Sequence, residues 1–196
     1  MSVVFEDGPS REESDVPRRV SAAEPSFSAR LAGTGLRDCF DFWRDRRMGR
    51  RPPLKRAIDP VDMPARILPN LFLYEAIGDR FHCRLAGTEI GAAFHRDPTG
   101  HYLDELVVPA AVSSRTRLFR GVLERERPVV YGGHLAEGPK KWMQFIRLLL
   151  PVSKTGERAD IVFGMIVFPY IDPRKMGNPP ERPMHDFEAW ATAEEL

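Results

Sequence analysis

The sequence has few of the features that tie a chain to a membrane, a disulfide scaffold or a polyanion. It has two cysteines among 196 residues, Cys39 and Cys83, and they lie on separate expected elements, which argues against a disulfide framework. No apolar run approaches the roughly 18 residues of a membrane span, and the polar, acidic first residues do not form a secretory leader. The formal net charge of +1 gives no overall attraction to nucleic acid or to acidic lipid. We therefore expect a cytoplasmic protein without a membrane span.

The common cofactor and catalytic motifs are also missing. The glycines form neither a G-x-G-x-x-G pattern nor a Walker sequence. No serine lies in a pattern that indicates a histidine and an acid as its catalytic partners. His95 and His101 flank a loop that contains Pro98 and Gly100, a spacing that fixes no metal geometry. Cys83 alternates with apolar neighbours, which indicates a small inward-facing hydrophobe rather than a reactive thiolate. We expect no catalytic residues and no metal site; any cofactor is unknown, and the sequence does not favour haem or flavin.

The chain divides into four segments by composition. Residues 1–30 are rich in charged residues, serine and proline and are expected to be a disordered extension. Residues 31–69 form a flanking helix and a proline-rich connector, residues 70–171 a core domain, and residues 172–196 a tail. In that tail, Phe187 and Trp190 are expected to dock a last helical turn. A hydrophobic content of 42% is enough for one well-packed core.

Apolar periodicity and turn residues predict the elements in this order. Leu36, Cys39, Phe40 and Trp43 share one stripe of an amphipathic helix. Asp59 caps a short helix that is expected to run to Leu68. Two strands around residues 71–77 and 81–86 form a hairpin at a glycine turn, and helices are expected at residues 88–94 and from residue 109 to before residue 128. Three antiparallel strands follow, at residues 129–135, 141–152 and 160–169.

Several short patterns along the chain resemble those of a stand-alone bacterial family of PAS-like domains. They are the pair Trp43-Arg44, the DP-x-D-x-P segment from Asp59 to Pro64, the run RLAGT from Arg84 to Thr88, and TG-x-x-LDEL from Thr99 to Leu106. The resemblance covers roughly residues 36–170. It implies an α+β fold with a five-stranded antiparallel sheet, helices on one face and an N-terminal flanking amphipathic helix. It also implies a sensory or signalling role.

The gap between the helices and the inner sheet face is where PAS domains hold ligands, so the resemblance and strand alternation together nominate cleft residues. The strand that follows the hairpin turn and the helical segment after it contribute Phe81, Cys83, Leu85, Phe94, His95, Tyr102 and Leu103. The later strands contribute Trp142, Gln144, Ile146 and Met165. Leu36, Phe40 and Trp43 suit a flanking helix that covers the outer sheet face or forms a homodimer.

We expect a ligand-sensing module that forms a homodimer and shifts between two conformational populations. It has no output domain on this chain and is expected to act through an unknown signalling partner. Two alternatives stay open. The first is a scaffold or interaction protein whose cleft is a filled core. The second is a binder of phosphate backbones or membrane surfaces through the basic cluster Arg44–Arg56, which holds seven basic residues and one acid, Asp45. Nucleic acid is the less favoured partner, because two prolines interrupt that cluster and its arginines have nearby aspartates to pair with.

Overall fold

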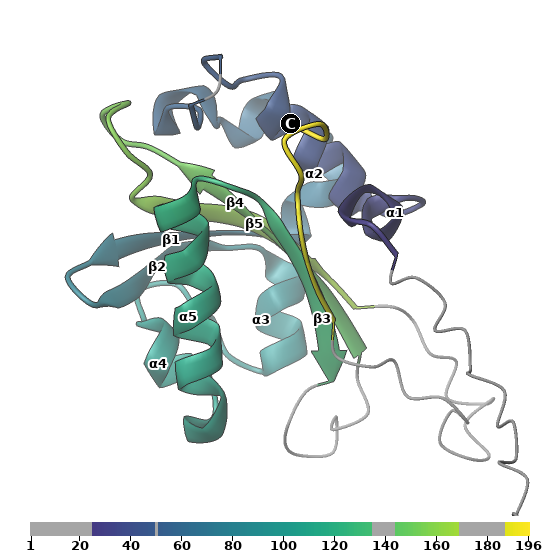
Figure 1. Cartoon of the computed structure of the whole chain (residues 1–196). Coiled ribbons are helices and arrows are strands. Elements are labelled where there is room, and N and C mark those ends of the chain that lie inside the picture. The colour runs from purple at the N-terminus through teal and green to yellow at the C-terminus, as the bar shows by residue number, and fades with distance from the viewer. Residues whose placement is uncertain (1–24, 50, 135–143, 169–186) are drawn as a thin grey trace, which may run out of the picture.

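A computed structural model describes residues 25–49, 51–134, 144–168 and 187–196. Its centre is a six-stranded antiparallel sheet in the order β2-β1-β5-β4-β3-β6 (Figure 1). The strands are β1 (Leu71–Ile77), β2 (Arg80–Ala86), β3 (Val129–His134), β4 (Gln144–Val152), β5 (Ile161–Val167) and β6 (Phe187–Trp190). The helices are α1 (Phe27–Leu31), α2 (Gly35–Arg44), α3 (Thr88–Phe94), α4 (Leu103–Leu106) and α5 (Pro109–Arg125).

The sheet joins two local pieces. The hairpin β1–β2 turns at Gly78, whose φ of 58° is the left-handed conformation that favours glycine. The meander β3–β4–β5 pairs through consecutive antiparallel neighbours, and β1 then pairs with β5 along Leu71–Glu75 and Ile161–Met165. The expected α+β architecture is therefore confirmed.

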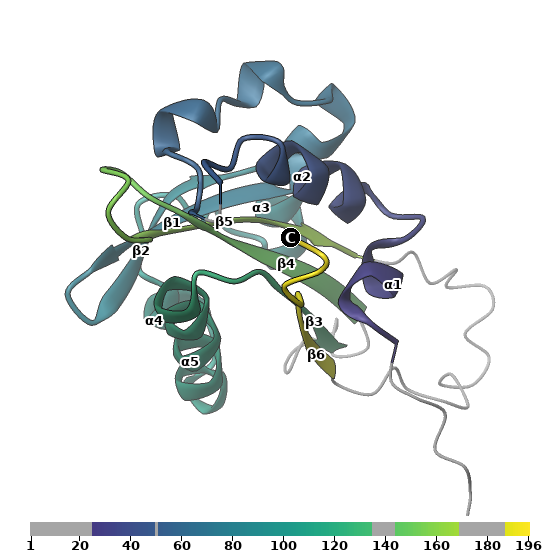
Figure 2. The same ribbon diagram turned by 45° about the horizontal axis from the view of Figure 1, so that its top comes forward.

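The N-terminal helices cover one face of the sheet, which we call the outer face (Figure 2). The stripe Leu36, Cys39, Phe40 and Trp43 of α2 is at most 1% exposed, because it packs against strand residues of the same chain. The Trp43 indole also donates a hydrogen bond of 2.7 Å to the carbonyl of Pro151 on β4. The expected flanking role of Leu36, Phe40 and Trp43 thus takes place within one chain, and their burial prevents them from forming a dimer surface.

Helices α3, α4 and α5 cover the opposite face, which we call the inner face (Figure 1). Its core includes Tyr74, Phe81 and Phe119, whose rings meet edge to face at centroid distances of 5.2–5.3 Å. The four strands β1, β3, β4 and β5 each place side chains in both the outer and the inner apolar core. This explains why β4 and β5 are apolar on both of their faces.

Three expectations are corrected. The sheet has six strands rather than five, because Phe187–Trp190 pairs with β3 as an edge strand and does not form a helical turn. The segment after Asp59 forms short 3₁₀ helices, η2 (Pro60–Asp62) and η3 (Ala65–Asn70), because Pro60, Pro64 and Pro69 remove the donors that an α-helix needs. Residues 27–31, most of which were assigned to the disordered extension, form α1 with Phe27 and Leu31 buried in the outer core.

None of the helices among the described residues is both long enough and apolar enough to cross a bilayer.

Candidate functional site

A small cavity lies between the inner sheet face and the segment that contains α3 and α4. Its volume is about 40 Å³. The floor comes from five strand residues, and the cover comes from α3, the following loop and α4. The lining residues are Phe72, Tyr74, Ala86, Ile90, Phe94, Arg96, Pro98, Leu103, Leu106, Val107, Arg147 and Ile166.

A β-bulge in the hairpin decides which β2 residues reach the cavity. Leu73 pairs with Leu85, but the next residue, Tyr74, pairs with Cys83, so Arg84 is the extra residue. A bulge of one residue reverses the alternation of side chains beyond it. Leu85 therefore shares the outer side with Leu73 and is 37% exposed, which corrects its expected place in the cleft. The same reversal turns Ala86 inward to line the cavity.

The facing of β4 and β5 is the reverse of the one expected. Ile146 on β4 and Met165 on β5 pack in the outer core, and Gln144 lies on the same side of β4 as Ile146. Phe145, Arg147 and Ile166 face inward instead. Both faces of these strands are apolar, so alternation shows that there are two sides without showing which side meets which helices. Trp142 lies outside the described residues.

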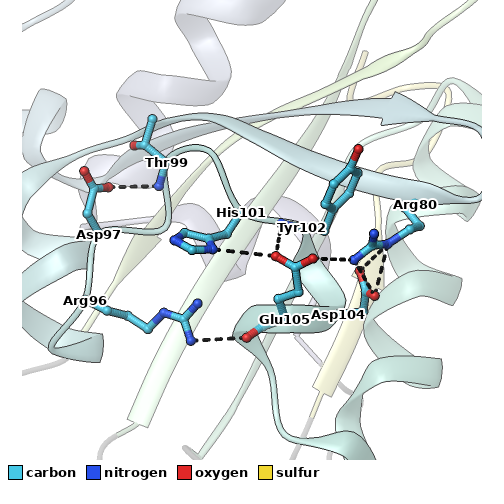
Figure 3. A network of polar contacts seen from close by, with 8 residues as sticks. All are labelled: Arg80, Arg96, Asp97, Thr99, His101, Tyr102, Asp104 and Glu105. Carbon is cyan, nitrogen blue, oxygen red and sulfur yellow. Dashed lines mark hydrogen bonds and ion pairs between the residues drawn. The ribbon is translucent and has the colours of Figure 1, made fainter.

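The LDEL run divides its residues between the cavity and the surface. Leu103 is buried, and with Leu106 it lines the cavity. Asp104 and Glu105 point away from it and form ion pairs of 2.9 Å and 2.7 Å with Arg80 on β2 (Figure 3). The motif therefore closes the cavity with its leucines and attaches the cover to the hairpin with its carboxylates.

Polar contacts hold in place the part of the cover that follows α3, residues 95–107 (Figure 3). Arg96 donates to the carbonyl of Glu105 at 3.2 Å, and Glu105 accepts from the backbone N–H of Tyr102 at 3.1 Å. The amide of Thr99 donates to Asp97 at 2.9 Å. These groups are exposed, so each contact contributes little alone and is weakened by salt.

The carboxylates of the cover are stabilised in their charged form. Hydrogen bonding to Arg80 lowers the pKa of Asp104 and of Glu105, the latter also through the Tyr102 amide. The Thr99 amide lowers the pKa of Asp97. These carboxylates of the cover therefore stay ionised to a pH below their ordinary pKa.

Two glycines of the family patterns are required by geometry. At Gly87, a Cβ atom would lie 2.2 Å from the carbonyl oxygen of Pro69, so only glycine lets β2 pass this close to η3. Gly100 has φ +86°, and its amide donates to the carbonyl of Cys83. The RLAGT and TG-x-x-LDEL runs thus shape the cover and its contact with β2.

The other expected cleft residues have mixed positions. Phe94 and Leu103 line the cavity. Phe81 and Cys83 are buried in the same inner core without lining it. His95 ends α3 in the left-handed conformation with its side chain exposed, because the chain must reverse there. Tyr102 lies outside the cavity, with the Arg80 guanidinium 3.7 Å from its ring centroid and the His82 ring at 5.0 Å.

The inner core keeps its titratable thiol and phenol neutral. Burial raises the pKa of Cys83 to about 11, and its Sγ donates to the carbonyl of Leu85 at 3.4 Å. Burial also raises the pKa of Tyr74 well above its ordinary value. At neutral pH neither group supplies a nucleophile or a base.

The cavity residues that sequence reasoning missed include Ala86, Arg96, Leu106, Arg147 and Ile166. Two of these could have been recognised from the sequence. Ala86 lies in RLAGT and Leu106 in LDEL, the runs by which the chain resembles its family. The sequence gives no such indication for Arg147, because in a strand with two apolar faces nothing shows that an arginine points inward.

Several arginines of the basic cluster are bound to the chain itself. Arg44 pairs with Asp41 at 3.0 Å, and Arg46 pairs with Asp62 at 3.5 Å while its guanidinium lies 3.4 Å from the Phe42 ring centroid. Arg47 donates to the carbonyl of Leu196 at 2.8 Å, and Arg51 donates to that of Gly156 at 3.1 Å. These contacts favour the structural interpretation of the cluster, and Arg50 lies outside the described residues.

The fold and the covered cavity define a class of α+β domain in which an antiparallel sheet and its helices enclose a central cavity. Comparison with family models assigns the chain within that class. Residues 31–167 match the model described as PAS domain, so the chain belongs to the PAS domain family. No curated protein and no solved structure matches the chain significantly.

Proposed function

We propose that this PAS domain is a cytoplasmic sensory module whose covered inner cavity binds a small molecule, and that it signals through a protein partner or a homodimer. The observation that carries the proposal is the cavity itself, which has apolar walls and a cationic group. Its cover is attached by exposed ion pairs, by backbone hydrogen bonds to Cys83 on β2 and by the buried Leu103. Ligand pockets combine apolar linings with a few polar groups in this way.

Signalling rather than catalysis suits this site. Cys83 and Tyr74 are held neutral, and no cluster of three histidine, cysteine or acidic side chains suited to a metal occurs among the residues that the structure describes. A bound molecule would act by favouring the closed arrangement of the cover, because its contacts with Leu103 and Leu106 exist only while α4 is in place.

The change would reach the surface by two routes. One route is the cover, whose Asp104 and Glu105 attach it to the hairpin through Arg80. The other is the sheet, since β4 pairs with β3, and β3 pairs with β6. A partner or a second copy that contacts either surface would sense whether the cavity is filled.

A scaffold with a filled core is the second candidate, and the cavity volume favours it. About 40 Å³ is well below the roughly 300 Å³ at which typical small-molecule pockets begin. A sensory role therefore requires either a very small ligand or an opening of the cover.

Thermal unfolding of the purified protein against a panel of small metabolites tests the proposal. A ligand that binds the folded chain raises Tm in proportion to its concentration relative to Kd. The Ala86→Leu variant, which places a larger side chain in the cavity, is the matched control and should lose the response. Native mass spectrometry of the same samples measures the oligomeric state. A panel without any Tm shift, together with an Ala86→Leu variant as stable as the parent, would support the scaffold.

A further inference from the structure

We propose that the ligand of this cavity is a short aliphatic monocarboxylate whose carboxylate group is bound by Arg147. The inference rests on the proposed function, because it names the chemistry of a ligand for the same cavity. Three features carry it: the Nε atom of Arg147, which has no hydrogen-bond partner among the described residues, the charge balance of the lining and the size of the space.

Arg147 lies in an aromatic environment with few hydrogen-bond partners. Its guanidinium carbon is 5.5 Å from the ring centroid of Phe72, 5.6 Å from that of Phe145 and 5.8 Å from that of Tyr131. One nitrogen donates to the Tyr131 hydroxyl at 3.0 Å. The Nε atom is buried and has no hydrogen-bond partner among the described residues.

This arrangement compensates the charge of Arg147 only in part. The residue is half-buried, and aromatic rings offset part of the cost of desolvating its guanidinium, but a cation withdrawn from water is normally also paired with a carboxylate or fully hydrogen-bonded. No described carboxylate forms an ion pair with Arg147, although the exposed Arg80 pairs with two. An anionic acceptor in the cavity would supply what Arg147 lacks.

The lining favours a single negative charge with an apolar tail. Its titratable residues are Tyr74 and two arginines, and it contains no acidic residue. Arg96 already donates to the Glu105 carbonyl and is exposed. The guanidinium fork matches a carboxylate with two parallel hydrogen bonds. The walls are apolar side chains from the floor and the cover, namely Phe72, Ile90, Phe94, Leu103, Leu106 and Ile166. A second charge on the ligand would be desolvated against these walls.

The size of the space sets the length of the tail. One water needs about 10–15 Å³ by the same measure, so about 40 Å³ holds roughly three waters. Acetate and propionate have about this bulk, and longer chains require the cover to move. The competing interpretation is that Arg147 only packs its stem and reaches solvent with its charged end.

An NMR titration separates the two interpretations. Isoleucine methyl groups are labelled with ¹³C, and sodium propionate or the neutral isostere propionamide is added at constant ionic strength. Ile90 and Ile166 line the cavity, whereas Ile67 lies in the outer core and serves as an internal control. We expect saturable shifts of the Ile90 and Ile166 methyl signals with propionate, and binding of propionamide weaker by at least about tenfold, because it lacks the charge-assisted hydrogen bonds.

Two variants test whether Arg147 binds the carboxylate group. Arg147→Met keeps the bulk of the stem, removes the charge and should weaken propionate binding by at least about tenfold. Arg66→Gln is the matched control, since Arg66 is exposed and pairs with Asp38 away from the cavity, and it should bind propionate like the parent. If Arg147→Met fails to fold, the comparison of propionate with propionamide on the parent protein decides alone.

The contrary outcomes are distinct. Equal binding of propionate and propionamide would overturn the role of charge while leaving a ligand-binding cavity. Saturable shifts with inorganic phosphate but not with propionate would overturn the monocarboxylate assignment. No response to propionate would also overturn it, whereas the proposed sensory function would still be decided by the metabolite panel.

Discussion

The two faces of the sheet are built from the same strands but differ in where they leave space. On the outer face that space is an open depression beside α2, lined by residues that include Gly35, Ile67 and Met165. On the outer face, α2 presents Leu36, Cys39 and Trp43 with no exposed surface, and the Trp43 indole is hydrogen-bonded. On the inner face, the cover leaves a cavity of about 40 Å³ and an arginine with a buried, unpartnered Nε atom. The outer face has the properties of a structural core, and the inner face is the one that we propose to hold a ligand.

The largest expected effect is on the outer face. Trp43→Ala removes a fully buried indole, and we expect the free energy of unfolding to fall by about 3–5 kcal/mol. Chemical denaturation followed by circular dichroism measures it. Trp43→Phe is the control, because it keeps an aromatic ring and chiefly loses the bond to Pro151, at a cost of about 1–3 kcal/mol. A loss below about 1 kcal/mol for Trp43→Ala would show that α2 is only loosely attached.

A matched pair of leucines compares the faces directly. Leu148 on the outer face is 0% exposed, and Leu103 in the cover of the inner face is 3% exposed. Leucine-to-alanine changes cost about 2–5 kcal/mol, and the cost is lower where the surroundings can collapse. We expect Leu148→Ala to lie near the upper end and Leu103→Ala near the lower end, measured by denaturant unfolding. Equal costs would mean that the inner face is as rigidly packed as the outer one.

The smallest effect is a dependence of the cover on pH. The pKa values of Asp97, Asp104 and Glu105 are lowered in the folded chain, so the folded state favours their ionised forms. Their contribution is present above the ordinary carboxyl pKa of about 4 and is lost as the pH falls through the lowered values. Hydrogen exchange of residues 96–107, corrected for the intrinsic rate at each pH, should accelerate on acidification before that of residues 36–44.

Arg80→Gln provides the control for that measurement. The variant removes the partner of both Asp104 and Glu105, so the cover should exchange faster at neutral pH and depend less on acid. The exchange of α2 should not change. If both segments of the parent responded to acid together, the cover would not be a separate unit of stability.

Much of the fold could be predicted because local signals agree with it. The stripe of α2, the glycine turn at Gly78 and the helix at residues 88–94 each follow from spacing or from one residue type. The sixth strand could not be predicted, because Phe187–Trp190 is short and its partner β3 is distant in the sequence. Pairing of this kind depends on tertiary packing rather than on local propensity.

The site was less predictable than the fold, for two physical reasons. A single bulge at Arg84 exchanged the roles of Leu85 and Ala86. The inner and outer faces of β4 are both apolar, so only the packing of the helices decides that Arg147 points inward and Ile146 outward. Leu103 and Leu106 were the exception, because they belong to the LDEL run of the family patterns and also line the cavity as part of its cover.

The pairing of β1 with β5 has a consequence for how the molecule folds. The hairpin β1–β2 and the meander β3–β4–β5 can each form from neighbouring residues, but Leu71–Glu75 must find Ile161–Met165 across the intervening chain. Closing a loop of that length costs conformational entropy before the contacts between β1 and β5 can offset this cost, and folding is therefore slower. Because β1 and β5 contribute side chains to both faces, neither the outer core nor the cavity is complete until these two strands pair. We therefore expect slow and cooperative folding in which the site and its support appear in one step.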